Sequence, residues 1–302
     1  MRSLLLLLSR SGRLRRWIEA SRLARRMASR FVAGDLLPDA LAVGRRINGQ
    51  GMFVTFDHLG ENVTLVEEAA ASREVYLRTL DEIAVSRMRA NVSIKLTQFG
   101  MDVSEQACRA NVEQLVCRAA DLGSFVRVDM ESSVYTTRTL ALVTQLHERY
   151  GSVGTVIQAY LYRSRADIEA LCERGIRVRL CKGAYLEPEE VAFRRKSEVD
   201  RNYIELMEIL LTRGVYPAIA THDPRMIDAT REFARRHDIP RNGFEFQMLY
   251  GIRRDLQRQL AAEDYRVRVY VPFGRAWYPY FMRRLAERPA NVLFLAKNLL
   301  RN

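Results

Sequence analysis

Short apolar runs alternate with longer amphipathic segments along most of the chain. The runs are rich in β-branched and aromatic residues, which favour strands. They cover residues 52–56, 92–96, 125–129, 155–158, 178–181, 217–220, 244–247 and 267–271. Each run is followed by enough chain for a helix, and this alternation predicts right-handed βαβ units with parallel strands. Eight such units over residues 51–302 predict one (β/α)8 barrel, with a doubly wound open sheet as the alternative.

Helical segments are predicted between these runs at residues 61–88, 104–121 and 189–213. Ser104 is suited to cap the second of these segments, and Gly214 is suited to end the third. Residues 13–48 are also predicted to be helical, with a second piece from about residue 38 to residue 47. We therefore expect residues 1–50 to form a helical arm in front of the barrel domain. No glycine-rich phosphate-binding turn opens a helix, which favours the barrel over the open sheet.

The charge of the chain is strongly positive, with a formal net charge of +12. The excess is greatest in residues 10–30, where eight arginines face a single acid, Glu19. This segment is compatible with a solvated basic helix, with contact to a membrane surface or with a targeting sequence. The apolar run at residues 4–8 is far too short to cross a bilayer. We expect a cytoplasmic protein, either soluble or held peripherally at the inner membrane.

Cysteine and histidine usage argues against several chemistries. The four cysteines, Cys108, Cys117, Cys172 and Cys181, form no C-x-x-C pair, which indicates buried reduced thiols. There is no H-E-x-x-H, G-x-S-x-G or P-loop motif, and the sequence therefore predicts no metal site and no activated serine. Without those groups, an organic cofactor is expected to carry any difficult chemistry.

Polar residues end or follow seven of the eight predicted strands, where catalytic groups of such barrels lie. They are Asp57, His58, Lys95, Asp129, Glu131, Gln158, Tyr160, Arg179, Lys182, Tyr185, Thr221, His222, Gln247 and Tyr270, with Leu249 beside them. Cations placed within apolar runs, such as Lys95 and Arg179, need buried partners or an anionic ligand.

A C-terminal helical segment adds four polar residues on one face. Tyr280, Arg283, Arg284 and Glu287 are spaced at i, i+3, i+4 and i+7. They could form a solvated stripe or a guanidinium fork that binds a carboxylate. With the strand-end cations they predict a net positive mouth, which suits an anionic substrate and a phosphate-bearing cofactor. A two-carboxylate glycosidase site is disfavoured. The residues alone leave the reaction open.

An ordered set of motifs resembles the proline dehydrogenase family in its short monofunctional bacterial form. The motifs begin with Ser93-Ile94-Lys95-Leu96, Val128-Asp129-Met130-Glu131, Ile157-Gln158-Ala159-Tyr160-Leu161 and Arg179-Leu180-Cys181-Lys182-Gly183-Ala184-Tyr185. They continue with Ala220-Thr221-His222, Phe244-Glu245-Phe246-Gln247-Met248-Leu249-Tyr250-Gly251 and Tyr280-x-x-Arg283-Arg284-x-x-Glu287. The resemblance extends from about residue 31 to residue 291.

The resemblance implies a distorted (β/α)8 barrel, TIM-like in form, that holds FAD noncovalently. It implies oxidation of L-proline to Δ1-pyrroline-5-carboxylate, the first step of proline catabolism, with electrons passed to a membrane quinone. A separate pyrroline-5-carboxylate dehydrogenase would take the product, and no nucleic acid is expected as a partner. Two alternatives remain at this point, a dehydrogenase for hydroxyproline or another imino acid and a noncatalytic binding protein.

The resemblance also implies residue roles. The substrate-binding residues would be Lys95, Asp129, Tyr185, Leu249, Tyr270, Tyr280, Arg283 and Arg284. The cofactor-binding residues would be Gln158, Arg179, Lys182, Gly183, Ala184, Thr221, His222 and Glu287. Two positions depart from the family pattern, Leu186 where many relatives have Trp and Asp223 where Asn is usual.

Overall fold

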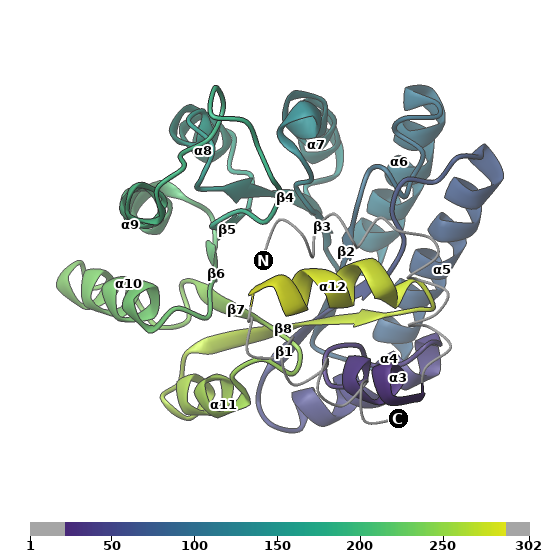
Figure 1. Ribbon diagram of the computed structural model, residues 1–302, viewed down its shortest axis with the longest axis horizontal. Coiled ribbons are helices and arrows are strands. Elements are labelled where there is room, and N and C mark those ends of the chain that lie inside the picture. The colour runs from purple at the N-terminus through teal and green to yellow at the C-terminus, as the bar shows by residue number, and fades with distance from the viewer. Residues whose placement is uncertain (1–21, 288–302) are drawn as a thin grey trace.

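A closed barrel of eight parallel strands forms the centre of the molecule, and the computed structural model describes residues 22–287 (Figure 1). The strands are β1 (Phe53–His58), β2 (Ala90–Ile94), β3 (Val126–Val128), β4 (Val153–Gln158), β5 (Val178–Cys181), β6 (Ala218–Ala220), β7 (Glu245–Leu249) and β8 (Arg266–Phe273). Each strand pairs with the next in sequence, and β8 closes the barrel against β1 in the register Phe53↔Arg268. The predicted TIM-like barrel is confirmed, and all eight apolar runs overlap a strand.

Helices surround the barrel on its outer side (Figure 1). They are α4 (Leu37–Asn48), α5 (Val66–Val85), α6 (Glu105–Asp121), α7 (Thr136–Tyr150), α8 (Ser164–Glu173), α9 (Lys196–Arg213), α10 (Pro224–Arg236) and α11 (Arg254–Ala262), with a 3₁₀ turn η1 (Ser133–Tyr135) before α7. Ser104 caps α6 as predicted, because its Oγ accepts a hydrogen bond of 3.2 Å from the backbone N–H of Ala107.

Helix α9 begins later than the sequence pattern predicts. Residues 191–193 instead lie along the end of β4, where the N–H of Phe193 donates to the Tyr160 carbonyl at 2.8 Å. An isolated antiparallel bridge between Leu161 and Ala192 holds the same segment. This backbone pairing competes with the helix, which therefore starts at Lys196 and ends at Gly214 as predicted.

The apolar core lies between the strands and the helices, and the interior of the barrel is polar. Outward residues such as Val92, Ile94 and Val269 belong to the main hydrophobic cluster. Inside the barrel, Arg268 Nε contacts Glu245 Oε1 at 2.8 Å, and Arg127 Nη1 donates to the Thr155 carbonyl at 3.0 Å. The alternation of apolar and polar residues in the strands therefore reflects two buried environments, and the polar one needs ion pairs and hydrogen bonds to be stable.

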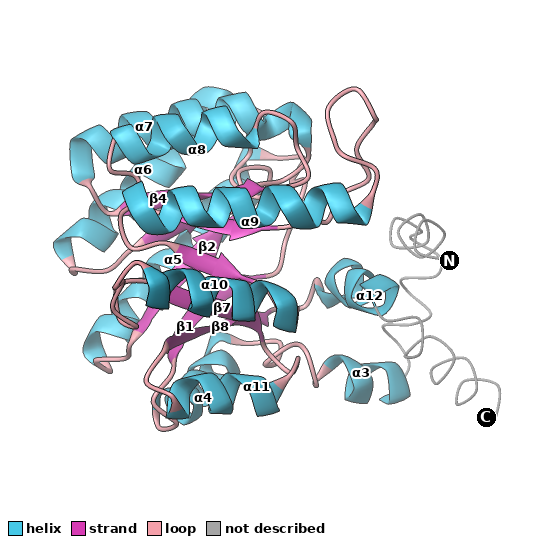
Figure 2. Cartoon of the chain, turned by 90° about the vertical axis from the view of Figure 1, so that its left-hand side faces the viewer, coloured by secondary structure: helices cyan, strands magenta, loops and turns pink. Residues whose placement is uncertain are grey.

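Two further helices pack together at the end of the barrel where β8 terminates. They are α3 (Arg22–Ala28) and α12 (Trp277–Glu287), which lie beyond the strands in Figure 2. They share a second hydrophobic cluster in which the rings of Phe31 and Phe281 are 6.4 Å apart. Because α12 follows β8 directly, this end is the C-terminal mouth of the barrel.

The predicted N-terminal arm is described only from residue 22 onward. Within it, α3 packs on α12, and α4 contributes Ala40, Leu41 and Ile47 to the main core. The boundary at residue 50 between arm and barrel stays a prediction. None of the helices among residues 22–287 is long and apolar enough to span a membrane.

The four cysteines are free thiols, as predicted. The prediction that they are buried holds only for Cys108, since Cys117, Cys172 and Cys181 are partly accessible.

Candidate active site

Five side chains from the ends of five strands meet at the C-terminal mouth of the barrel. They are Asp57 of β1, Lys95 just after β2, Asp129 just after β3, Arg179 of β5 and Tyr270 of β8. We call this set the mouth cluster. Parallel strands place their carboxyl ends at one edge, so residues far apart in sequence converge there.

Lys95 is one of the two buried cations of the mouth cluster, with a relative exposure of 6%. Its Nζ lies 3.0 Å from Asp57 Oδ1 and 3.7 Å from Asp129 Oδ2. Burial by itself lowers the pKa of the Lys95 ammonium, but the two carboxylates outweigh it and hold the pKa above its ordinary value. Lys95 is therefore charged at neutral pH.

Asp129 joins the other members of the cluster. Its Oδ1 accepts from Arg179 Nη1 and from Ser93 Oγ, each at 2.7 Å, and its Oδ2 accepts from the Tyr270 hydroxyl at 2.8 Å. Burial tends to raise the pKa of Asp129, but Arg179 and Lys95 lower it below its ordinary value. Asp129 is therefore an anion that holds one lysine, one arginine and one phenol in place.

Arg179 is fixed by three contacts, and one of its guanidinium nitrogens is left without a partner among the described residues. Besides Asp129, its guanidinium contacts Ser93 Oγ at 3.3 Å and lies over the Tyr270 ring, 5.3 Å from the ring centre. Among the described atoms its Nε is buried and has no hydrogen-bond partner. An unpaired buried donor is costly, so this N–H is a candidate contact for a ligand acceptor atom.

A second group of charges surrounds Lys182, which follows β5. Its Nζ contacts Asp200 Oδ1 at 2.5 Å and Asp223 Oδ2 at 2.8 Å. Lys196 and Arg225 complete the group by pairing with Asp200 Oδ2 at 2.5 and 2.9 Å. Partial burial would raise the pKa of Asp223, but the Lys182 ammonium holds it below its ordinary value. We call these five residues the Lys182 network.

Gly183 has a positive φ of 112°, and a Cβ at this position would overlap the ring of Tyr160. Glycine at this position therefore allows the chain after β5 to approach the ring of Tyr160 closely. Ala184 and Tyr185 follow, both partly buried. The nearby Gln158 is 2% exposed and donates through Nε2 to the Glu131 carbonyl at 2.9 Å.

The ends of β6 and β7 are connected through His222. Its Nε2 accepts from the backbone N–H of Leu249 at 2.9 Å, which places the proton of a neutral imidazole on Nδ1. The preceding Thr221 is 6% exposed and accepts through Oγ1 from the N–H of Asp223 at 3.1 Å. The two loops are thus held together, and Leu249 has a defined position.

Helix α12 brings the buried residue Tyr280, 5% exposed, to the mouth. The backbone of α12 continues to Glu287, as predicted, so residues 280, 283, 284 and 287 share one helical face. The side chains of Arg283, Arg284 and Glu287 lie outside the described residues, and their predicted contacts stay predictions.

The sequence predicts an excess of positive charge at the mouth. The predicted cations whose side chains the structure describes show no such excess. Lys95, Arg179 and Lys182 each have a carboxylate partner in the structure. The prediction overlooked the neutralising role of Asp57 and the presence of Asp200, and it also missed Ser93. Asp57 is among the predicted strand-end residues, but the sequence did not indicate its pairing with Lys95. Asp200 had no local signal, since it lies inside an ordinary amphipathic helix.

Within residues 22–287, no three His, Cys, Asp or Glu side chains are grouped so as to hold a metal ion.

Comparison with known proteins gives consistent results. Residues 40–297 match the family model described as proline dehydrogenase. The chain is 41% identical to proline dehydrogenase 2 of Bacillus subtilis over 99% of this chain and 98% of that protein. It is 40% identical to a proline dehydrogenase of Deinococcus radiodurans over 91% of this chain and 90% of that protein. Among solved structures, proline utilization A of Bdellovibrio bacteriovorus matches with a TM-score of 0.80 and 28% identity, over 87% of this chain and 32% of that one.

Proposed function

Because the chain belongs to the proline dehydrogenase family, we propose that it oxidises L-proline to Δ1-pyrroline-5-carboxylate. The observation that supports this most is the mouth cluster, where a charged lysine and arginine share Asp129 beside the aromatic ring of Tyr270. Such a site combines ionic groups for an amino-acid substrate with an aromatic surface for its carbon ring.

We propose FAD as the cofactor, and two observations are compatible with it. The buried Nε–H of Arg179, which has no partner among the described residues, would suit a ring nitrogen of the flavin. The Lys182 network contains three cations and two carboxylates, and its positive excess would suit a cofactor phosphate. The proposed cofactor-binding residues are Gln158, Arg179, Lys182, Gly183, Ala184, Thr221, His222 and Glu287.

The substrate would lie between the mouth cluster and α12. The proposed substrate-binding residues are Lys95, Asp129, Tyr185, Leu249, Tyr270, Tyr280, Arg283 and Arg284. Lys95 is charged at neutral pH and buried, so it can hold a carboxylate with little solvent screening. Leu249 and Tyr270 would supply apolar and aromatic walls for the pyrrolidine ring.

The proposed reaction removes two electrons and two protons from the ring C5–N bond. When bound, FAD would supply the two-electron acceptor; the hydride leaves C5, the ring nitrogen loses its proton and the C5=N bond forms. The protein's part is orientation, because hydride transfer requires the donor carbon to be held in close, aligned contact with its acceptor. The Arg179 cation, fixed by Asp129 and Tyr270, would stabilise negative charge that develops nearby.

Electron transfer from the reduced cofactor to a membrane quinone is also proposed, as is transfer of the product to a separate pyrroline-5-carboxylate dehydrogenase. The proposed activity requires an electron acceptor, because the bound cofactor must be reoxidised between turnovers. The cytoplasm, with peripheral contact to the inner membrane, is the proposed location.

The proposed function is tested by anaerobic titration of the purified protein with L-proline. We expect a yellow protein whose flavin absorption band bleaches as proline is added and returns with a quinone acceptor. A colourless protein that cannot be reconstituted with FAD would overturn the proposal. If the protein clearly prefers trans-4-hydroxy-L-proline, that compound becomes the proposed substrate in place of L-proline.

Asp223 is expected to weaken FAD binding, because its carboxylate competes with a cofactor phosphate for Lys182. The Asp223→Asn variant should lower the Kd for FAD by roughly fivefold, about 1 kcal/mol for a partly screened charge. Asn can still cap α10, where Asp223 Oδ1 accepts from the Arg225 N–H at 3.1 Å. The measurement is quenching of FAD fluorescence by apoprotein.

The matched control for this variant is Asp228→Asn, the same charge change at an exposed position of α10. The Kd of Asp228→Asn for FAD should equal that of the wild type. The advantage of Asp223→Asn should shrink at high salt, where charges are screened. Equal or weaker FAD binding by Asp223→Asn would contradict the proposed role of Lys182.

Leu186 is the other position that departs from the family pattern. Its side chain is 60% exposed, and nothing in the structure explains the difference.

A further inference from the structure

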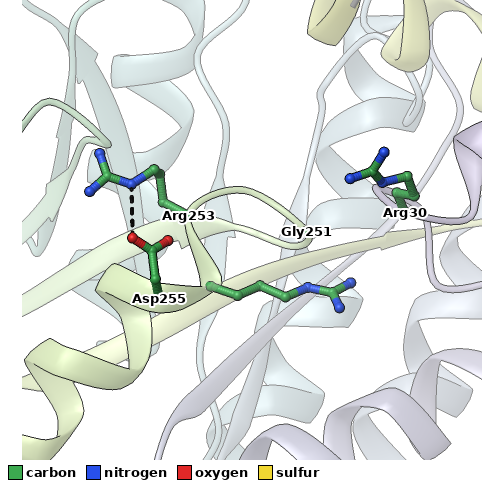
Figure 3. A pocket seen from close by; sticks show the side chains of 5 residues that line it. Arg30, Gly251, Arg253 and Asp255 are labelled. Atoms are coloured by element: carbon green, nitrogen blue, oxygen red, sulfur yellow. Dashed lines mark ion pairs between the residues drawn. The ribbon is translucent and has the colours of Figure 1, made fainter.

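The geometry points to a separate binding site for a phosphate group, in a pocket at the mouth of the barrel. The pocket has a volume of about 360 Å³ and is lined by Arg30, Gly251, Arg253, Arg254 and Asp255. Figure 3 shows Arg30 on one side and Arg253 with Asp255 on the other, while Gly251 lies in the loop between them. We call it the arginine pocket.

The arginine pocket has more positive than negative charge. Asp255 is the one carboxylate among the described lining residues, and it pairs with Arg253 through a rather long contact of 3.5 Å between Oδ2 and Nε (Figure 3). Arg30 and Arg254 have no carboxylate partner among the described residues. Three guanidiniums and one carboxylate leave two positive charges, which a doubly charged phosphate would balance.

The position of these arginines is defined by the surrounding fold. The Arg254 guanidinium lies over the ring of Tyr250, 5.3 Å from its centre, and the Tyr250 hydroxyl accepts from Arg46 Nη2 at 3.1 Å. Gly251 has a positive φ of 79°, and a Cβ there would overlap the Arg30 carbonyl oxygen. Glycine therefore allows the chain after α3 to approach the loop after β7, which brings Arg30 to the other two arginines.

The chemistry of the lining selects the class of ligand. Guanidinium groups donate two parallel hydrogen bonds and match phosphate oxygens well. The volume is within the range of small-ligand sites, roughly 300–1,000 Å³, so a phosphate with an organic substituent would fit. None of the described residues that line the pocket is apolar or aromatic, which favours a polar substituent. A free phosphate ester and a phospholipid headgroup share this chemistry.

The first arm of the test measures binding of inorganic phosphate to the full-length holoprotein by titration calorimetry at constant ionic strength. The double variant Arg30→Gln/Arg254→Gln should weaken binding by about tenfold or more. Neither arginine has a carboxylate partner in the described structure, so folding should be unaffected, as a thermal melt can verify. The control Arg235→Gln/Arg236→Gln removes the same charge from the exposed end of α10 and should bind like the wild type.

The second arm measures cosedimentation with vesicles of phosphatidylglycerol and phosphatidylcholine. If the ligand is a phospholipid headgroup, the wild type and the control should bind vesicles that contain phosphatidylglycerol, and the double variant should not. If the ligand is a free phosphate ester, the protein should bind inorganic phosphate, and the double variant should bind the vesicles as the wild type does. The proposal is overturned if neither probe binds, or if the control variant weakens binding as much as the double variant does. Oxidation of L-proline with a soluble acceptor should be unchanged in the double variant, so this test is independent of the proposed function.

Discussion

Replacement of Asp129 with Asn is expected to lower kcat/KM for L-proline by roughly 100-fold or more. Asp129 accepts hydrogen bonds from Ser93, Arg179 and Tyr270 and lies near Lys95. The amide of Asn can accept through one oxygen only, and it has no charge. Among the described residues Lys95 would then keep Asp57 as its carboxylate partner and Arg179 would keep none, so both would change position.

The Asp129→Asn variant has a second expected signature. Loss of a negative charge beside Arg179 should raise the reduction potential of bound FAD, because the reduced flavin carries more negative charge. The potential is measured by anaerobic dye equilibration. The control is Ser93→Ala, which removes a single neutral partner of Asp129 and should cost less than about tenfold in kcat/KM. Near-wild-type kinetics and potential in Asp129→Asn would show that the cluster is not part of the site.

The pH dependence of stability follows from the direction of the pKa shift. The pKa of Asp129 is lowered from 3.8 by Arg179 and Lys95, which overcome the opposing effect of burial. Its contribution to stability is therefore present above pH 3.8 and is lost as the pH falls through the lowered pKa. We expect the wild type to lose stability in acid more steeply than Asp129→Asn, measured by urea unfolding.

Replacement of Lys95 with Met is expected to destabilise the fold by about 3 kcal/mol and to raise KM for L-proline strongly. Met keeps the unbranched shape of the lysine stem but removes the ammonium that lies 3.0 Å from Asp57. Asp57 is completely buried, and among the described atoms its Oδ2 already has no hydrogen-bond partner. An uncompensated carboxylate in this position is costly.

A rescue variant separates the structural effect of Lys95 from its effect on substrate binding. Lys95→Met/Asp57→Asn removes both charges, so it should recover most of the lost free energy of unfolding while KM stays high. From neutral pH up to pH 10.5 the stability difference between wild type and Lys95→Met should be constant, and it should decrease as the pH rises through the raised pKa of Lys95. Full recovery of KM in the double variant would exclude a direct contact of Lys95 with the substrate.

The barrel and the general position of its site were predictable from the chain because both depend on local properties. Strands such as β5 (Val178–Cys181) are short apolar runs with turn signals around them, and the polar residues after them follow from chain order alone. Closure of β8 on β1 follows from the number of units and the handedness of each connection. The start of α9 was predicted too early, because pairing of residues 191–193 with residues 160–162, just after β4, is a tertiary contact.

The sequence by itself determined which residues reach the mouth, and the tertiary structure decided how they are paired. Asp129 and Tyr270 are hydrogen-bonded although 141 residues separate them, and nothing local to either residue indicates the other. The carboxylate of Asp200 reaches Lys182 from within α9, and Arg30 reaches the arginine pocket through a close contact that Gly251 permits. Ion pairs depend on distances of a few ångströms and on the direction of side chains, and only packing of distant segments sets these quantities.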